Sequence, residues 1–316
     1  HNGAGEMLVF SAADFEDFRM PRPTVTSDMN NDLEAVVRLH ATYNETITEA
    51  LNVFEKVHRD IPFDGLHWFF DHAETVTDIN LERIAKLGGG IAIQHRMAYQ
   101  GEYFVQRYGR KAAERTPPYR RMLNMGVNVG AGTDATRVSS YDPWNALYWM
   151  ITGRTVGGLS LYPRENLIDR ETALRLYTHA NTWFSNEEGV KGQIKTGQYA
   201  DLAVLSADYF EIPDHEIRQM VSVLTLVDGN IVYASDEFSG SAPPLPPAMP
   251  DWSPVNHFGG YYKPAADPVH AFASMACGCS NRCIVHGHAH GRAYHNAVTA
   301  TDQGGFWGAL GCSCWV

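Results

Sequence analysis

Short apolar runs alternate with amphipathic stretches along the first three-fifths of the chain. The run VVRLH (36–40) is short, apolar and β-branched, which is typical of a strand buried in a parallel sheet. The segment NETITEALNVFEKVH that follows places Ile47, Leu51 and Phe54 at helical spacing, with Asn44 as the expected N-cap. Such strand-then-helix units recur about every 30–40 residues. The pattern predicts parallel strands joined by right-handed crossovers, and therefore an α/β fold.

The glycines and prolines of this region mark where elements begin and end. Gly88 is expected to end one helix, and Pro143 to lie in the first turn of another. The segment 96–109 is rich in arginine and aromatic residues, and we expect a loop there. The predicted strands are 6–12, 36–40, 66–72, 90–95 and 127–134, and the predicted helices are 44–58, 77–88, 117–126, 143–152 and 169–184.

The pattern changes near residue 190. Short strands around glycine-containing turns follow, and LVDGNIVYA predicts a hairpin that turns at Asp228-Gly229 or Gly229-Asn230. Beyond residue 235 comes a stretch rich in proline and aromatic residues, typical of an extended segment, and then a tail rich in cysteine and histidine. We therefore divide the chain into an α/β domain (1–189), a small β module (190–235) and an extension with its tail (236–316).

Composition excludes two classes of partner. The formal net charge of -11 over 316 residues argues against nucleic acid, because no basic stripe is present to neutralise phosphates. No apolar run is long enough to predict a membrane span. No apolar signal-peptide core follows the first residue, so we expect a cytoplasmic protein. Because the chain starts at His1 rather than Met, a targeting signal cannot be read from this sequence.

Three polar residues stand where predicted strands end. His40 ends VVRLH, His72 ends HWFFDH, and Asp134 ends VNVGAGTD. The carboxyl ends of barrel strands converge on one site, and imidazole and carboxylate are ligands for Zn, Fe or Mn. For Asp134 the other interpretation is a plain turn residue behind Gly130 and Gly132.

Three longer segments carry a resemblance to a known family: FDHAETVTDINLERIAKLGGGIAIQH (70–95), MGVNVGAGTDATRVSSYDPWNALYWMITGRT (125–155) and GVKGQIKTGQYADLAVLSAD (189–208). In order and spacing they resemble the metal-dependent amidohydrolase superfamily, in the amidohydrolase-3 branch related to N-substituted formamide deformylases. The resemblance covers residues 6–235. It implies a (β/α)8 barrel with a metal centre, a small β-sandwich beside it, and hydrolysis of a non-peptide C–N bond in a small-molecule substrate.

The resemblance also implies roles for single residues. His40 and His72 match the metal-binding histidines that end the fifth and sixth strands. Asp134 matches the aspartate of the eighth strand, which binds metal and takes the proton of the attacking water. His95 becomes a candidate substrate contact, and the loop after it, with Arg96 and Tyr99, a candidate wall of the substrate pocket. The implied cofactor is a divalent metal, with zinc preferred and iron or manganese open.

Two carboxylates flank His72 in the sequence, Asp71 and Glu74. They are candidates to orient the imidazole ring, since a metal-binding histidine commonly donates its second N–H to a carboxylate or carbonyl. The other interpretation, which we prefer at this point, is that both carboxylates are solvated on the surface.

The sequence departs from the family pattern at its front. No His-x-His pair precedes His40, and the segment LVFSAADFEDF contains no lysine that could bridge two metals. By the family pattern the chain corresponds to strands four to eight, a partial TIM-type (β/α) barrel, plus a β-sandwich-like module. An arc of strands has two open edges, so we expect a complementing chain, a homo-oligomer or a rearranged sheet. The alternative function is a catalytically impaired fragment or half-enzyme that binds metal or mediates assembly.

The tail suggests a second metal site. Cysteine and histidine at short spacing can bind zinc, although the C-x-C spacing here is not the C-x2-C of zinc ribbons. The alternative is a glycine-rich tail that packs on the barrel, with its cysteines as small apolar residues. The candidate ligands of the tail are Cys277, Cys279, Cys283, His286, His288 and His290.

Overall fold

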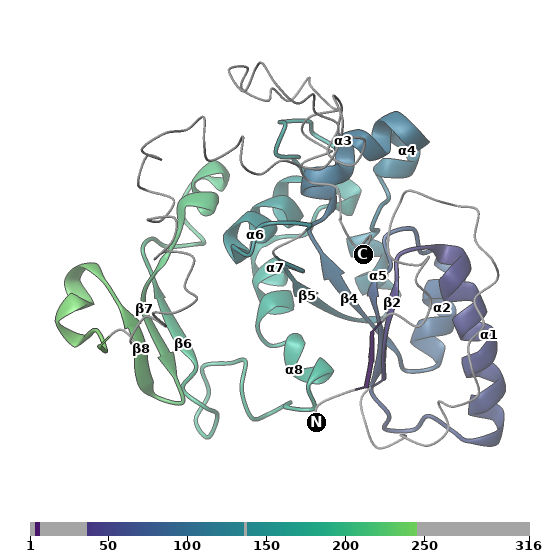
Figure 1. The fold of residues 1–316 in the computed structure, drawn as a ribbon, viewed down its shortest axis with the longest axis horizontal. Coiled ribbons are helices and arrows are strands. Elements are labelled where there is room, and N and C mark those ends of the chain that lie inside the picture. The colour runs from purple at the N-terminus through teal and green to yellow at the C-terminus, as the bar shows by residue number, and fades with distance from the viewer. Residues whose placement is uncertain (1–3, 7–36, 136–137, 245–316) are drawn as a thin grey trace, which may run out of the picture.

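The computed structural model describes residues 4–6, 37–135 and 138–244 and contains two sheets (Figure 1). One sheet has five parallel strands and the other has three antiparallel strands. The strands of the parallel sheet are β1 (Ala4–Glu6), β2 (Val37–Ala41), β3 (Trp68–His72), β4 (Gly90–Gln94) and β5 (Asn128–Gly132), and those of the antiparallel sheet are β6 (Leu202–Leu205), β7 (Ser222–Val227) and β8 (Asn230–Ala234).

The parallel strands lie side by side in the order in which they occur in the chain, β1-β2-β3-β4-β5. Neighbouring strands of a (β/α) barrel follow this order, whereas a doubly wound sheet reverses its order at a switch point. The predicted α/β class is confirmed. Closure into a barrel is not confirmed by the five strands that the structure describes. Of the predicted strand 6–12, only its first residue belongs to a described strand, β1.

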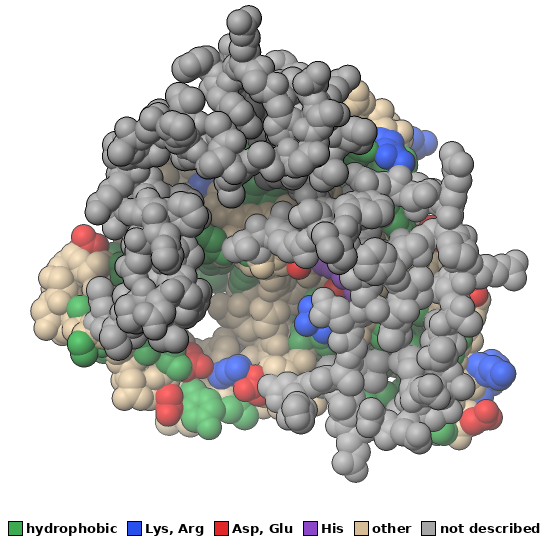
Figure 2. Space-filling model, in the orientation of Figure 1, with side chains coloured by type: hydrophobic (Ala, Val, Ile, Leu, Met, Phe, Trp, Pro, Cys, Tyr) green, Lys and Arg blue, Asp and Glu red, His purple; other side chains and the backbone are tan. Residues whose placement is uncertain are grey.

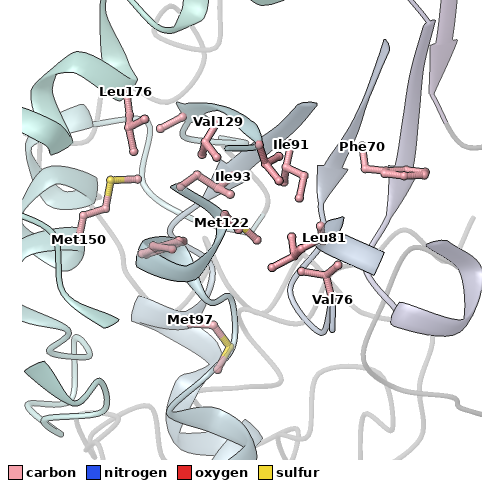
Figure 3. Packing of buried hydrophobic residues seen from close by; sticks show 14 of the residues in the cluster. Phe70, Val76, Leu81, Ile91, Ile93, Met97, Met122, Val129, Met150 and Leu176 are labelled. Atoms are coloured by element: carbon pink, nitrogen blue, oxygen red, sulfur yellow. The ribbon is translucent and has the colours of Figure 1, made fainter. Parts of the chain in front are cut away.

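Helices follow each of the strands β2 to β5 and pack on one face of the sheet. Trp68 and Phe70 of β3 point to this face and meet Phe54 of the first helix, with ring centroids 4.9 and 6.1 Å apart. Figure 3 shows the continuation of the same core around Ile91 and Met122. The helices are α1 (Asn44–Asp60), α2 (Asp78–Lys86), α3 (Met97–Tyr108), α4 (Arg110–Ala113), α5 (Tyr119–Asn124), α6 (Pro143–Thr152), α7 (Arg170–Tyr177) and α8 (Asn181–Phe184), with 3-10 turns at Arg164–Asn166, Asp214–Gln219 and Asp236–Ser241.

The short helix α8 covers the other face of the sheet near the amino ends of the strands. The Phe184 ring meets Phe69 with centroids 4.8 Å apart, and a Cβ on Gly90 would fall 2.6 Å from the Trp183 ring. The Asn181 side chain donates to the Ala131 carbonyl oxygen at 3.0 Å and accepts from the Ala131 amide at 3.1 Å. Asn181 thus satisfies both backbone groups of one residue of β5.

Three expectations about helices need correction. The expected loop at 96–109 is largely helix α3, because Met97, Gly101 and Phe104 are buried at helical spacing. The expected helix at 169–184 is split into α7 and α8 at Thr178, whose φ of -121° and ψ of -95° are not helical. Asn44 is not the N-cap of α1, since Tyr43 takes that place.

The Asn44 side chain instead serves the following helix. Its oxygen accepts from the Thr77 amide at 3.0 Å and from the Asn80 side chain at 2.8 Å, which satisfies the start of α2. Two other predictions about helix ends are confirmed. Gly88, with φ of +70°, follows the end of α2, and Pro143 opens α6 with Asp142 as its side-chain cap.

The antiparallel sheet is built around the predicted hairpin. The β7–β8 turn is Asp228-Gly229, with φ of 50° and 74°, as in the mirror-image turns that suit the twist of a hairpin. This sheet lies apart from the parallel one, at the left of Figure 1. Its strands fall within the residues predicted for the small β module (190–235), and the proposed boundary at 189/190 lies between α8 and β6. Across the described ranges, no helix is both long and apolar enough to cross a bilayer.

Candidate metal centre

Two histidines face each other where β2 and β3 end. In the sheet register His40 lies opposite Asp71, and Ala41 opposite His72. The Nδ1 atom of His40 is 3.1 Å from the Nε2 atom of His72, and the ring centroids are 4.1 Å apart. Two nitrogens that bind one zinc ion at 2.0–2.1 Å with a tetrahedral angle lie about 3.3 Å from each other. The spacing of this pair therefore suits a shared metal ion.

The backbone at this point departs from strand geometry. His72 and Ala73 have φ values of 75° and 50°, and Asp134 at the end of β5 has 52°. For residues other than glycine this left-handed region costs of order 1–3 kcal/mol, and such residues cluster at functional sites. The Ala73 amide still donates to the Ala41 carbonyl at 3.0 Å, which keeps the β3 end beside β2. Two of the three predicted ligands thus occupy strained positions.

A residue that the sequence prediction missed, Gln94, contacts His72 directly. Its side-chain oxygen lies 2.6 Å from Nδ1 of His72, and its side-chain nitrogen donates to the Ala92 carbonyl at 2.9 Å. The Tyr119 hydroxyl donates to the Gln94 carbonyl at 3.0 Å. The available signal was its place at the end of the strand next to β3, the same criterion that selected His40 and His72.

The two carboxylates that flank His72 are buried, so the expectation that they are solvated surface groups is wrong. Asp71 accepts a hydrogen bond from Arg38. The Glu74 and Arg96 side chains are each 2% exposed, and their charged atoms lie 3.6 Å apart. The same Glu74 oxygen is 4.0 Å from Nδ1 of His72. A buried charged pair therefore lies directly beside the candidate centre.

Asp134 lies at the edge of this group. Its side chain is 42% exposed, and its Oδ2 is 3.9 Å from Nδ1 of His72. That nitrogen is on the opposite side of the ring from the one that faces His40. Within the ranges that the structure describes, no group of three His, Cys, Asp or Glu side chains has the spacing of a metal site. Figure 2 shows one face of the molecule, with histidine side chains visible near its middle.

Burial decides the protonation of the histidines here. It lowers the pKa of His72 well below its ordinary value, and the neighbouring His40 and Arg96 act in the same direction. Burial alone lowers the pKa of His95 to about 4. An imidazole binds a metal only in its neutral form, so the environment of His72 favours the state that a ligand needs.

The predicted substrate contacts are more buried than a pocket wall. His95 is fully buried, and neither ring nitrogen has a hydrogen-bond partner among the described residues. Its ring lies 5.6 Å from that of Tyr99, a partly buried residue of α3 whose pKa is raised by burial. Arg96 precedes α3 and faces Glu74. The substrate-binding roles of His95, Arg96 and Tyr99 remain predictions, and the six candidate ligands of the tail lie outside the described residues.

Comparison with known proteins decides the family. The model of the Amidohydrolase family matches residues 1–233. The chain belongs to this family. The resemblance inferred from residues 70–95, 125–155 and 189–208 is therefore confirmed.

Two curated relatives match about a third of their own length. The N-substituted formamide deformylase of Arthrobacter pascens is 28% identical over 197 residues, which are 62% of this chain and 36% of the relative. The YtcJ protein of Bacillus subtilis (strain 168), named as an amidohydrolase, is 25% identical over 201 residues, or 62% and 37%. The chain thus spans a little over a third of the curated family members that it matches.

A solved structure shares the fold. An uncharacterized metal-dependent hydrolase from Pyrococcus horikoshii OT3 superposes with a TM-score of 0.50 at 22% identity, over 58% of this chain and 36% of that one. The described part of this chain thus shares its fold with part of that hydrolase.

Proposed function

We propose that this chain provides the metal-binding part of an amidohydrolase site and acts in the hydrolysis of a non-peptide C–N bond of the amide or formamide type. The observation that carries the proposal is the His40–His72 pair, whose nitrogens face each other at 3.1 Å at the ends of adjacent strands. The name of the deformylase relative supports the choice of bond. The substrate is a small molecule.

The residues present fit a metal in part. Two neutral imidazole nitrogens are good ligands for zinc, iron or manganese, and we propose zinc. A divalent ion at this place supplies a Lewis acid that polarises the carbonyl and acidifies water. A complete coordination shell needs more ligands than the two nitrogens, and Asp134 supplies an exposed carboxylate 3.9 Å from the His72 ring.

In this proposal Asp134 accepts a proton from the attacking water. The carboxylate is solvent-accessible and lies 3.9 Å from Nδ1 of His72, so it can reach both water and the His72 ring. The buried Glu74–Arg96 pair and Gln94 keep the His72 ring in place. We assign His95, Arg96 and Tyr99 to substrate binding, with Tyr99 the most accessible of the three.

A second candidate function is a half-enzyme or impaired fragment that binds metal and assembles with a complementing chain or with a second copy. This function is favoured because the described part of the chain brings together two histidines but no group of three possible metal ligands. In this case the activity belongs to the assembly rather than to one chain.

Metal analysis of the purified full chain tests the proposal. We expect about one equivalent of zinc at the pair, a large loss of it in His40→Ala and His72→Ala, and no change in His215→Ala, whose side chain is exposed. Zinc that stays unchanged in the double variant His40→Ala/His72→Ala contradicts the proposal and points to the tail cysteines.

Hydrolysis of an N-substituted formamide then separates the two functions. Turnover that falls by orders of magnitude in Asp134→Asn while zinc remains bound supports an enzyme. Zinc binding at the pair without turnover by the isolated chain supports the half-enzyme.

A further inference from the structure

Gln94 is placed to decide which nitrogen of His72 carries the proton. Its side chain is nearly fully buried at the end of β4, with Oε1 2.6 Å from Nδ1 of His72. An amide side chain can present either its oxygen or its NH2 group. Here the choice is made at the other end, because the NH2 group donates to the Ala92 carbonyl at 2.9 Å. The oxygen is therefore the atom that faces His72.

We propose that Gln94 is a positioning residue that keeps His72 in the Nδ1–H tautomer, so that the lone pair of Nε2 points toward His40. A neutral imidazole has one N–H donor and one acceptor. Because the Gln94 oxygen can only accept, Nδ1 is the donor and Nε2 carries the lone pair. This lone pair faces Nδ1 of His40 at 3.1 Å. The inference deepens the proposed function, since Nε2 becomes the ligand atom of His72.

Among the residues that the structure describes, the other groups near Nδ1 are too far away to replace Gln94. Asp134 and Glu74 have oxygens 3.9 and 4.0 Å from Nδ1, beyond hydrogen-bond distance. The Gln94 backbone is itself fixed, because it pairs with Gly132 of β5 and accepts from Tyr119 at 3.0 Å. The direction of the Gln94–His72 bond is thus set by atoms outside the candidate centre.

The arrangement also predicts a proton movement at His40. Two lone pairs do not face each other at 3.1 Å, so in the metal-free protein the His40 Nδ1–H donates to Nε2 of His72. A metal ion held by Nδ1 of His40 and Nε2 of His72 would require that proton to move to Nε2 of His40. The tautomer of His72 would stay unchanged. Gln94 therefore fixes the ligand atom of His72 before a metal binds, whereas His40 would have to change its tautomer.

The test is the nitrogen-15 NMR spectrum of the imidazoles in the metal-free full chain. We expect His72 to show a protonated Nδ1 and an unprotonated Nε2 in the wild type and in Gln94→Glu, whose oxygens still accept. Gln94→Met and the shorter Gln94→Asn lose the acceptor at this place, and we expect a mixture of His72 tautomers. Gln100→Met is the matched control, since Gln100 is equally buried but lies on α3.

The zinc affinity of the same variants, measured by titration, is a second test. Loss of such an outer partner typically weakens metal binding 10- to 100-fold, and we expect this for Gln94→Met but not for Gln100→Met. A wild-type His72 protonated on Nε2, or a tautomer unchanged in both Gln94→Met and Gln94→Asn, overturns the inference. Zinc binding indifferent to His72→Ala overturns the proposed function instead, and the wild-type spectrum still decides the tautomer.

Discussion

All five residues of β3 are buried, whereas four of the five residues of β8 are exposed. The parallel sheet has helices on one face and α8 on part of the other, so its apolar side chains are covered by the same chain. The antiparallel sheet presents Val204, Val232 and Tyr233 to solvent. The parallel sheet therefore gains more from the burial of apolar side chains than the antiparallel sheet does.

The candidate metal centre lies on the better-covered of these two sheets. His72 ends the fully buried strand β3 and has a left-handed backbone, which is tolerated only where the surroundings fix it. A site that needs two imidazoles at one spacing benefits from a rigid frame.

The largest expected difference in stability is between alanine variants of two isoleucines, one in each sheet. Ile91 in β4 is fully buried, and Ile231 in β8 is 37% exposed. Ile91→Ala should lower the free energy of unfolding by about 2–5 kcal/mol through lost burial and a cavity, and Ile231→Ala by roughly 1 kcal/mol or less. Urea unfolding of both variants measures the difference. Equal losses would show that the two sheets are equally well packed.

The second contrast is between a buried and an exposed histidine. His95 has a folded-state pKa of about 4, below the ordinary value of about 6.5 of an unfolded chain. Between these values the unfolded chain binds a proton that the folded chain does not. The free energy of unfolding should therefore fall as the pH drops from 6.5 to 4, by up to about 3 kcal/mol for this group.

Urea unfolding between pH 4 and pH 7 measures this effect. The variant His95→Phe should flatten the slope by up to one proton and leave the stability at pH 7 nearly unchanged, because the ring makes no hydrogen bond to a described residue. The variant His215→Phe, at an exposed position between β6 and β7, is the matched control for the same exchange of side chain. An unchanged slope in His95→Phe would contradict the assignment of the titrating group.

The smallest effect concerns the hairpin of the antiparallel sheet. Gly229 has φ of +74° and nothing closer than 4.0 Å to an added Cβ, so Gly229→Ala meets backbone strain alone. We expect a loss of about 1 kcal/mol, measured by urea unfolding. Gly240→Ala, at a position with open space and no left-handed φ, should have almost no effect. If Gly229→Ala lowered the free energy of unfolding by more than Ile91→Ala does, the predicted order of the two sheets would be wrong.

The sequence predicted what depends on local pattern. The strands β2 to β5 were predicted because each lies in a short apolar run, and the pairing of His40 with His72 followed from two strand ends in one sheet. The helix α3 was missed because its arginines and aromatic residues obscured the buried positions Met97, Gly101 and Phe104.

Longer-range contacts could not be read from the sequence. The break at Thr178 accompanies a contact between Asn181 and β5 some fifty positions earlier in the chain. The role of Gln94 depends on where its amide points, which is set by the Ala92 carbonyl. Burial of Glu74 likewise depends on its contact with Arg96, which the local sequence pattern does not predict.

The contact between Asn181 and Ala131 has a consequence for assembly. A side-chain amide that both donates to and accepts from one residue does what a neighbouring strand would do at that position. Any strand that joins β5 at Ala131 must first displace this amide and lose two hydrogen bonds, roughly 1–3 kcal/mol in total. Asn181 would therefore compete with a complementing chain, as in the second candidate function, for the same edge, and it makes the capture of an unrelated strand less favourable.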